Sequence, residues 1–165
     1  MLIILGGLPG AGKTTIAREL ARQLRAVHVR IDSIEGAVRQ GGVTVLNDIG
    51  YRVGYQVAED NLKLGHSVIA DSVNPLAITR NAWVQVAKHS GAQSVEIEIR
   101  CSDSREHRRR VESRTSDVPG LRAPTWQEVV EHEYEPWDRA RVEIDTAERS
   151  VVQSIAEALA AVPSA

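Results

Sequence analysis

The residues with the clearest chemical potential lie near the N-terminus, where glycines precede a lysine and a threonine. The run GLPGAGKT, residues 7–14, satisfies the pattern G-x-x-x-x-G-K-S/T in full. In this pattern the glycines let backbone N–H groups turn toward a phosphate, the lysine reaches the β- and γ-phosphates, and the hydroxyl binds Mg²⁺. The start of the following helix adds about half a positive charge. The run therefore predicts a site for the phosphates of a nucleotide.

The neighbouring segments support this interpretation over a chance match. Residues 2–5 are entirely apolar, as expected for a buried parallel strand, and residues 13–24 carry an apolar stripe with helical spacing. A strand, a glycine-rich loop and a helix in this order are the context that the motif needs. We expect nine consecutive residues to contact the nucleotide: Gly7, Leu8, Pro9, Gly10, Ala11, Gly12, Lys13, Thr14 and Thr15.

The rest of the chain alternates between strand-like and helix-like segments. Further strands are predicted at residues 26–32, 66–71, 94–101 and 141–145. Further helices are predicted at residues 33–40, 47–65, 75–91, 103–114, 125–136 and 150–162. This alternation predicts an α/β fold of three layers, with a parallel sheet covered by helices on both faces.

Carboxylates close three of the predicted strands, at Asp32, Asp71 and Asp145, at the edge where ligands of such sheets bind. Asp71 ends the apolar run VIAD, and an aspartate in this place would hold a Mg²⁺ water or the Thr14 hydroxyl. Asp32 ends the second strand in VRID and has two possible roles. It could cap the helix predicted at residues 33–40, or it could take part in chemistry at the same edge.

Arginines concentrate in the predicted helix 103–114. Arg110 and Arg114 stand four residues apart, so they would share one helix face. Guanidinium groups bind phosphate oxygens bidentately and stay charged, which suits them to a transferring phosphoryl group. A solvated basic helix, paired with its own glutamates, is the alternative.

Composition limits the classes of protein that remain. The 165 residues suit one domain, residues 1–165, and the net charge of −2 gives no basic field for nucleic acid. Cys101 is the only cysteine, which excludes an intramolecular disulfide and a metal site of several thiolates. No segment has the length and apolarity of a membrane span. We expect a cytoplasmic protein without a membrane partner.

By its phosphate-loop motif and the order of its elements, the chain resembles the small phosphate-loop kinases. These include shikimate, gluconate and adenylyl-sulfate kinases, chloramphenicol phosphotransferase and the kinase domain of polynucleotide kinases. The resemblance covers nearly the whole chain. It implies ATP and Mg²⁺ as cofactors, a five-stranded parallel sheet of order 2-3-1-4-5, and a helical lid at about residues 103–124.

The resemblance also implies roles for individual residues. Asp32 would orient or deprotonate the acceptor hydroxyl, and Asn74, in DSVN, would lie near the acceptor. Of the two arginines, Arg110 and Arg114, one would stack near the adenine and another would stabilise the charge on the transferring phosphoryl group beside Lys13. Thr146, directly after the last strand, would also lie near the adenine.

The acceptor is left open by the sequence. Polynucleotide kinases carry Asp-x-x-Arg after the second strand, whereas this chain has DSIE and only Arg39 as an approximate substitute. DSIE is similar to the D-S-x-x-E region of chloramphenicol phosphotransferase. We therefore expect transfer from ATP to a hydroxyl of a small molecule. A polynucleotide 5′-hydroxyl kinase and a nucleotide-dependent switch remain as alternatives.

Overall fold

The computed structural model describes residues 1–42, 44 and 48–163. Its five strands form one parallel sheet in the order β2-β3-β1-β4-β5, which confirms the expected order. The strands are β1 Leu2–Gly6, β2 Val27–Arg30, β3 Val68–Asp71, β4 Ser94–Arg100 and β5 Val142–Asp145.

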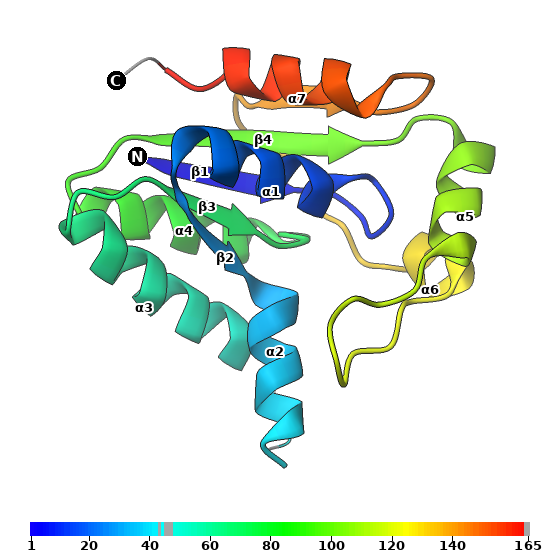
Figure 1. Cartoon of the computed structure of the whole chain (residues 1–165), viewed down its shortest axis with the longest axis horizontal. Helices are drawn as coiled ribbons and strands as arrows, with labels where there is room; N and C mark the ends of the chain where they lie inside the picture. The colour runs from blue at the N-terminus through cyan, green and yellow to red at the C-terminus, as the bar shows by residue number, and fades with distance from the viewer. Residues whose placement is uncertain (43, 45–47, 164–165) are drawn as a thin grey trace.

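Helices cover both faces of the sheet, as the alternating pattern predicts. They are α1 Lys13–Leu24, α2 Ile31–Gln40, α3 Ile49–Lys63, α4 Ala77–His89, α5 Ser104–Ser113, α6 Trp126–Val130 and α7 Val151–Ala160. Helices α1 and α7 lie on one face, and α3 and α4 lie on the other (Figure 1). Helices α2, α5 and α6 stand beyond the carboxyl ends of the strands, where a ligand would bind (Figure 1).

Strand β1 joins the two halves of the core because its side chains alternate between the faces. Leu2 and Ile4 pack with Trp83 of α4 in one apolar cluster. Ile3 and Leu5 pack in a second cluster with α1. These four side chains are all fully buried. Because a central parallel strand is covered on both faces, its sequence is continuously apolar.

Two glycines of α3 let it approach α2 closely. A Cβ added at Gly54 would lie 2.5 Å from Cδ1 of Ile31, and one at Gly50 would lie 2.6 Å from Cγ of Glu35. Both distances are shorter than packed side chains allow. Glycines weaken a helix, but here they allow this close contact, which fixes the first turn of α2 beside the sheet.

The boundary between β2 and α2 was predicted two residues too late. The strand ends at Arg30, and the helix begins at Ile31 without a side-chain cap. Ile31 and Ile34 lie three residues apart and both pack against the core, as side chains on one face of a helix do. This burial favours helix from Ile31 onward, although the β-branched residues of the segment favour a strand. Asp32 therefore lies in the first turn of α2, where its charge is favoured by the helix dipole.

The helix predicted at residues 125–136 is wrong beyond Val130. Its start is confirmed, because Thr125 and Glu128 form a capping box. After α6 the chain has no helix up to Pro136. Backbone carbonyl groups in this segment bind the buried guanidinium of Arg80 instead of backbone N–H groups of a helix. This guanidinium donates to the carbonyl oxygens of Glu135 and Pro136 at 3.0 and 3.1 Å.

Smaller differences concern helix ends. Helix α3 spans Ile49–Lys63, and Asn47, where the predicted helix 47–65 begins, lies outside the described residues. Gly65 and Gly91, the last residues of the predicted helices 47–65 and 75–91, follow α3 and α4 with φ of 87° and 64°, the left-handed conformation common for glycines just after a helix. Among the described residues, no helix has the length and apolarity to cross a membrane.

Candidate active site

The phosphate loop joins β1 to α1 and has the backbone conformation that its glycines permit. Gly7, Gly10 and Gly12 have φ of 131°, 86° and 104°. A Cβ at Gly7 would lie 2.0 Å from the carbonyl oxygen of Ile99, and one at Gly10 would lie 2.5 Å from Cγ2 of Val111. Strand β4 and helix α5 therefore pack so closely against the loop that no side chain fits at these two glycines. The glycines keep it open toward the N-terminus of α1.

Lys13 opens α1 and is nearly enclosed, with 8% of its surface exposed. Its Nζ donates to the carbonyl oxygen of Leu8 at 2.9 Å, so the side chain folds back along the loop. Burial lowers the pKa of Lys13 to about 8, although the nearby charges of Asp71 and Asp32 act in the opposite direction. The ammonium group is thus poorly solvated, and a bound anion would stabilise its charged form.

Raising the pH above about 8 should therefore weaken nucleotide binding, because Lys13 then loses its proton in the free protein. Bound phosphates favour the charged form, so affinity should fall by up to about tenfold for each pH unit above the pKa. Titration calorimetry with Mg·ADP between about pH 7 and about pH 10 measures this. A Lys13→Arg variant keeps its charge and should lose the pH dependence. A flat profile in the wild-type protein would contradict the assignment.

Asp71 ends β3 beside the phosphate loop, and only 3% of it is exposed. One carboxylate oxygen lies 3.1 Å from Nε2 of His28. Burial opposes its charge, but His28, Lys13 and the Thr14 hydroxyl together hold the pKa of Asp71 below its ordinary value. A charged carboxylate beside a hydroxyl is an oxygen donor set that fits Mg²⁺. The structure thus brings together the two residues predicted to bind the metal.

Arg110 and Thr146 meet beside the phosphate loop. The Arg110 guanidinium donates to the hydroxyl of Thr146 at 2.7 Å and to its carbonyl oxygen at 2.9 Å. The same hydroxyl lies 2.9 Å from the carbonyl oxygen of Ala11 in the loop. Thr146, predicted near the adenine, and one of the two predicted lid arginines are therefore neighbours, and hydrogen bonds connect them to the phosphate loop.

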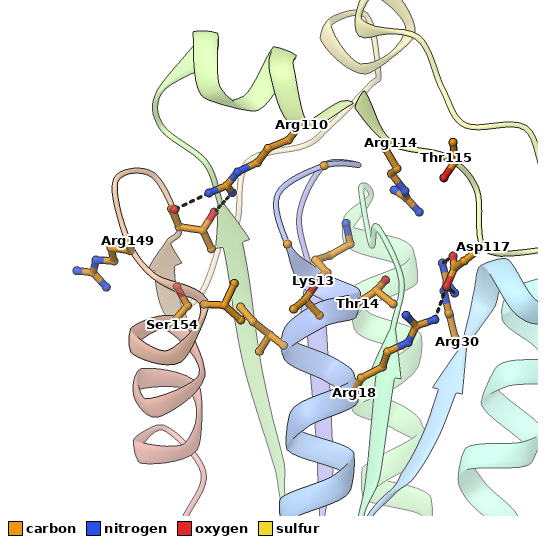
Figure 2. A pocket seen from close by; sticks show the side chains of 16 residues that line it. Lys13, Thr14, Arg18, Arg30, Arg110, Arg114, Thr115, Asp117, Arg149 and Ser154 are labelled. Atoms are coloured by element: carbon orange, nitrogen blue, oxygen red, sulfur yellow. Dashed lines mark hydrogen bonds and ion pairs between the residues drawn. The ribbon is translucent and has the colours of Figure 1, made fainter. Parts of the chain in front are cut away.

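The prediction that Arg110 and Arg114 share a helix face is wrong. Helix α5 ends at Ser113, and Arg114 has the extended backbone of φ −79° and ψ 130°. Val111 is the last buried apolar residue of α5, so nothing holds the next turn against the protein. Arg114 consequently lies on the other side of Lys13 from Arg110 (Figure 2).

Two cavities meet at the phosphate loop. The larger, of about 450 Å³, extends from Thr146 and Arg110 along the loop. The smaller, of about 180 Å³, contains Asp32 and Asp71 and is closed by residues 121–124. Three residues line both: Lys13, Thr14 and Arg114. Asp32 lines only the smaller cavity. This arrangement provides two compartments that share a cationic junction.

The other two predicted substrate residues lie outside both cavity linings. Asn74 is fully buried with φ 48°, and its side-chain amide donates to the carbonyl oxygen of Leu5 at 2.7 Å. Arg39 lies on α2 and pairs with Glu35 at 3.4 Å. Contact of either residue with an acceptor stays a prediction.

Sequence reasoning missed Arg30, which lines the larger cavity and is 6% exposed. It binds Asp117, a residue of the loop after α5 that is 87 positions away in the chain. An arginine near the end of a strand and an aspartate in a polar loop have no spacing signature. Only their place at the ligand-binding edge of the sheet could have drawn attention to them.

Comparison with known proteins places the chain in a family. Residues 2–132, most of the chain, match the AAA_33 family, described as an AAA domain. The chain belongs to this family. No match was found among curated proteins.

Solved structures of similar fold are phosphate-loop kinases and a related protein. A gluconokinase from Sinorhizobium meliloti 1021 is 17% identical, with a TM-score of 0.67 over 96% of this chain and 89% of that one. The Mycobacterium tuberculosis APS kinase CysC, in complex with AMPPNP and APS, is 18% identical, with a TM-score of 0.70 over 96% and 95%. Chaetomium thermophilum Kti12, in complex with ADP-AlF3, is 23% identical, with a TM-score of 0.68 over 99% and 100%. This AAA_33 protein therefore has the fold of the small phosphate-loop kinases.

Proposed function

We propose that this protein transfers the γ-phosphoryl group of Mg·ATP to a hydroxyl group of a small molecule. The observation that carries the proposal is the junction of the two cavities at Lys13, Thr14 and Arg114. A nucleotide in the larger cavity would present its last phosphate at this junction. A hydroxyl in the smaller cavity would face the same point, which is the arrangement an in-line transfer requires.

The nucleotide side rests on the phosphate loop and the Arg110–Thr146 pair. The loop and the start of α1 would hold the β-phosphate, and Lys13 would turn from the Leu8 carbonyl oxygen to the phosphates. Arg110, held by Thr146, would lie beside the adenine. In the proposed function residues 103–124 act as a lid, because residues of this segment line both cavities.

The acceptor side rests on Asp32. Its carboxylate is 40% exposed and lines the smaller cavity, so it can contact a molecule bound there. The cavity volume of about 180 Å³ is below the roughly 300–1,000 Å³ of sites for drug-sized ligands. A compact alcohol fits this space better than a stretch of nucleic acid does. The volume therefore favours a small acceptor over a polynucleotide end.

The chain's own groups would carry the reaction as follows. Asp32 would orient the acceptor hydroxyl and accept its proton as the new O–P bond forms and the bond to the leaving diphosphate breaks. Lys13 and Arg114 would neutralise the charge of the transferring group at the junction. Residues 121–124 would exclude water, the competing acceptor.

The metal would be held by the Thr14 hydroxyl and the Asp71 carboxylate, the oxygen donors that meet beside the loop. His28 would keep the carboxylate oriented through its hydrogen bond. When bound, Mg²⁺ supplies positive charge to the β- and γ-phosphate oxygens.

The proposal is tested by ATP consumption in the presence of Mg²⁺ and a panel of hydroxyl compounds. The panel contains neutral sugars, sugar acids, nucleosides, chloramphenicol and a 5′-hydroxyl oligonucleotide. We expect one class of small alcohols to stimulate consumption well above the rate with water alone. Stimulation by the oligonucleotide only would favour a polynucleotide kinase. Saturable ATP binding without stimulation by any compound would favour a nucleotide-dependent switch.

A further inference from the structure

The lid loop, residues 114–124, contacts the β2–α2 junction through an ion pair between the buried Arg30 and the more exposed Asp117. Arg30 donates from both terminal nitrogens to the two carboxylate oxygens of Asp117, at 3.0 and 2.9 Å. Arg18 of α1 also pairs with this carboxylate (Figure 2). Arg30 is 6% exposed, whereas the Arg18 side chain is 53% exposed. Because exposed pairs contribute little, the Arg30–Asp117 pair is the stronger attachment.

Arg30 also faces the carboxylates of the candidate active site. Its guanidinium lies 3.6 Å from Asp32 and 3.9 Å from Asp71. Burial opposes its charge, but Asp117, Asp32 and Asp71 together raise the pKa of Arg30 above its ordinary value. One buried cation thus contacts the lid loop, the predicted base and the predicted metal ligand.

A second contact, made by an apolar side chain and a neutral hydrogen bond, holds the same loop against α2. Val118 is 7% exposed and packs over Gly36, where an added Cβ would lie 2.4 Å from Cγ1 of Val118. The side-chain amide of Gln40 donates to the carbonyl oxygen of Pro119 at 2.9 Å. The lid loop is therefore fixed by two neighbouring contacts of different chemistry.

Arg114 lies only three residues before Asp117, so the position of Asp117 restricts where Arg114 can reach. Arg114 lines both cavities beside Lys13. Within the described part of the chain, its guanidinium forms no ion pair closer than 4.0 Å. It is therefore held at the junction by its backbone, and the backbone is held by the contacts of Asp117 and Val118.

We propose that Arg30 is a positioning residue that clasps Asp117 and thereby holds Arg114 against the terminal phosphate of the bound nucleotide. The clasp rests on the proposed nucleotide site. It has a specific consequence: the contact between Arg30 and Asp117 should strengthen the binding of a nucleoside triphosphate more than that of a diphosphate, because it acts through Arg114. No acceptor is needed to see this effect.

The test measures the dissociation constants of Mg·AMPPNP and Mg·ADP by titration calorimetry. In Asp117→Asn, AMPPNP should bind about tenfold more weakly, the scale of one charge-assisted hydrogen bond, while ADP binding stays within about twofold. Arg114→Gln should show the same selective loss. Because Asp117 acts through Arg114, the double variant should lose no more than Arg114→Gln alone.

Four further variants distinguish loss of this contact from a non-specific loss of nucleotide binding. Arg30→Lys keeps the charge but loses the bidentate geometry, so it should match Asp117→Asn. Gly36→Ala should displace Val118 and reproduce the selective loss without removing a charge. Glu112→Gln is the matched control: it removes the same charge from an exposed pair on α5, and AMPPNP binding should not change.

Gly41→Ala provides the corresponding control for the glycine change, since a Cβ there would meet only ordinary contacts at 3.4 Å or more. Equal weakening of ADP and AMPPNP, or additive losses in the double variant, would overturn the clasp. Unchanged AMPPNP binding in both Asp117→Asn and Gly36→Ala would also overturn it. Failure of the wild-type protein to bind either nucleotide would overturn the proposed function and the clasp with it.

Discussion

Replacing Asp32 with asparagine is expected to lower the turnover of phosphoryl transfer by at least about a hundredfold, the usual scale for a general base. Asparagine keeps the size of the side chain but cannot accept the hydroxyl proton. ATP affinity should change by less than about threefold, because Asp32 lines only the smaller cavity. Steady-state kinetics with the acceptor from the panel gives turnover, and calorimetry with Mg·AMPPNP gives affinity.

Asp60→Asn serves as the matched control, since Asp60 is exposed on α3, where its carboxylate accepts a hydrogen bond from Gln56. It should leave both quantities unchanged. If Asp32→Asn kept full turnover, the proton acceptor would have to be another group and the acceptor site would be misplaced. If it weakened AMPPNP as much as it slowed transfer, Asp32 would belong to the nucleotide site.

The second large effect is expected at Lys13. Lys13→Met should lower turnover by about 10²–10³-fold or more, the loss seen when a preorganised group at the developing charge is removed. Unlike Asp32→Asn, it should also weaken Mg·ADP and Mg·AMPPNP, because the ammonium group would contact bound phosphates before and during transfer. The two variants together separate the nucleotide side from the acceptor side.

The stability of the free Lys13→Met protein provides its own check. A lysine whose pKa is lowered to about 8 on folding binds fewer protons in the folded than in the unfolded state between that pH and its ordinary pKa of 10.5. Its charge therefore costs stability below about pH 8, and this cost fades as the pH rises toward 10.5. At neutral pH the unfolding temperature of Lys13→Met should be no lower than that of the wild-type protein. A clear drop would mean that Lys13 supports the fold and that its loss of activity is indirect.

Much of this fold could be predicted because, for most segments, the local sequence pattern and the burial of the side chains favour the same secondary structure. The apolar run of β1, the phosphate loop and α1 were predicted nearly to the residue, since each has its own strong pattern. The predictions failed where a distant group decides the local structure. Arg80 holds residues 135 and 136 without helix, although the local composition favours one. Packing of Ile31 on α3 shortens β2.

The candidate site divides in the same way. Residues inside a motif or at a strand end, such as Thr14 and Asp71, could be found because the motif or the sheet edge places them. The Arg30–Asp117 pair could not, because it joins positions far apart in the chain through a loop without regular structure. The helical spacing of Arg110 and Arg114 was misleading for a related reason: the helix needs a buried anchor after Val111 and has none.

The most direct test of the account follows the phosphate itself. ATP labelled at the γ-phosphate is incubated with the protein, Mg²⁺ and the stimulating small alcohol, and the labelled products are separated. The account predicts that the label appears as a phosphate ester of the alcohol, and that Asp32→Asn abolishes this product while nucleotide binding is retained. Label recovered only as inorganic phosphate, in equal amounts with and without the alcohol, would contradict the account.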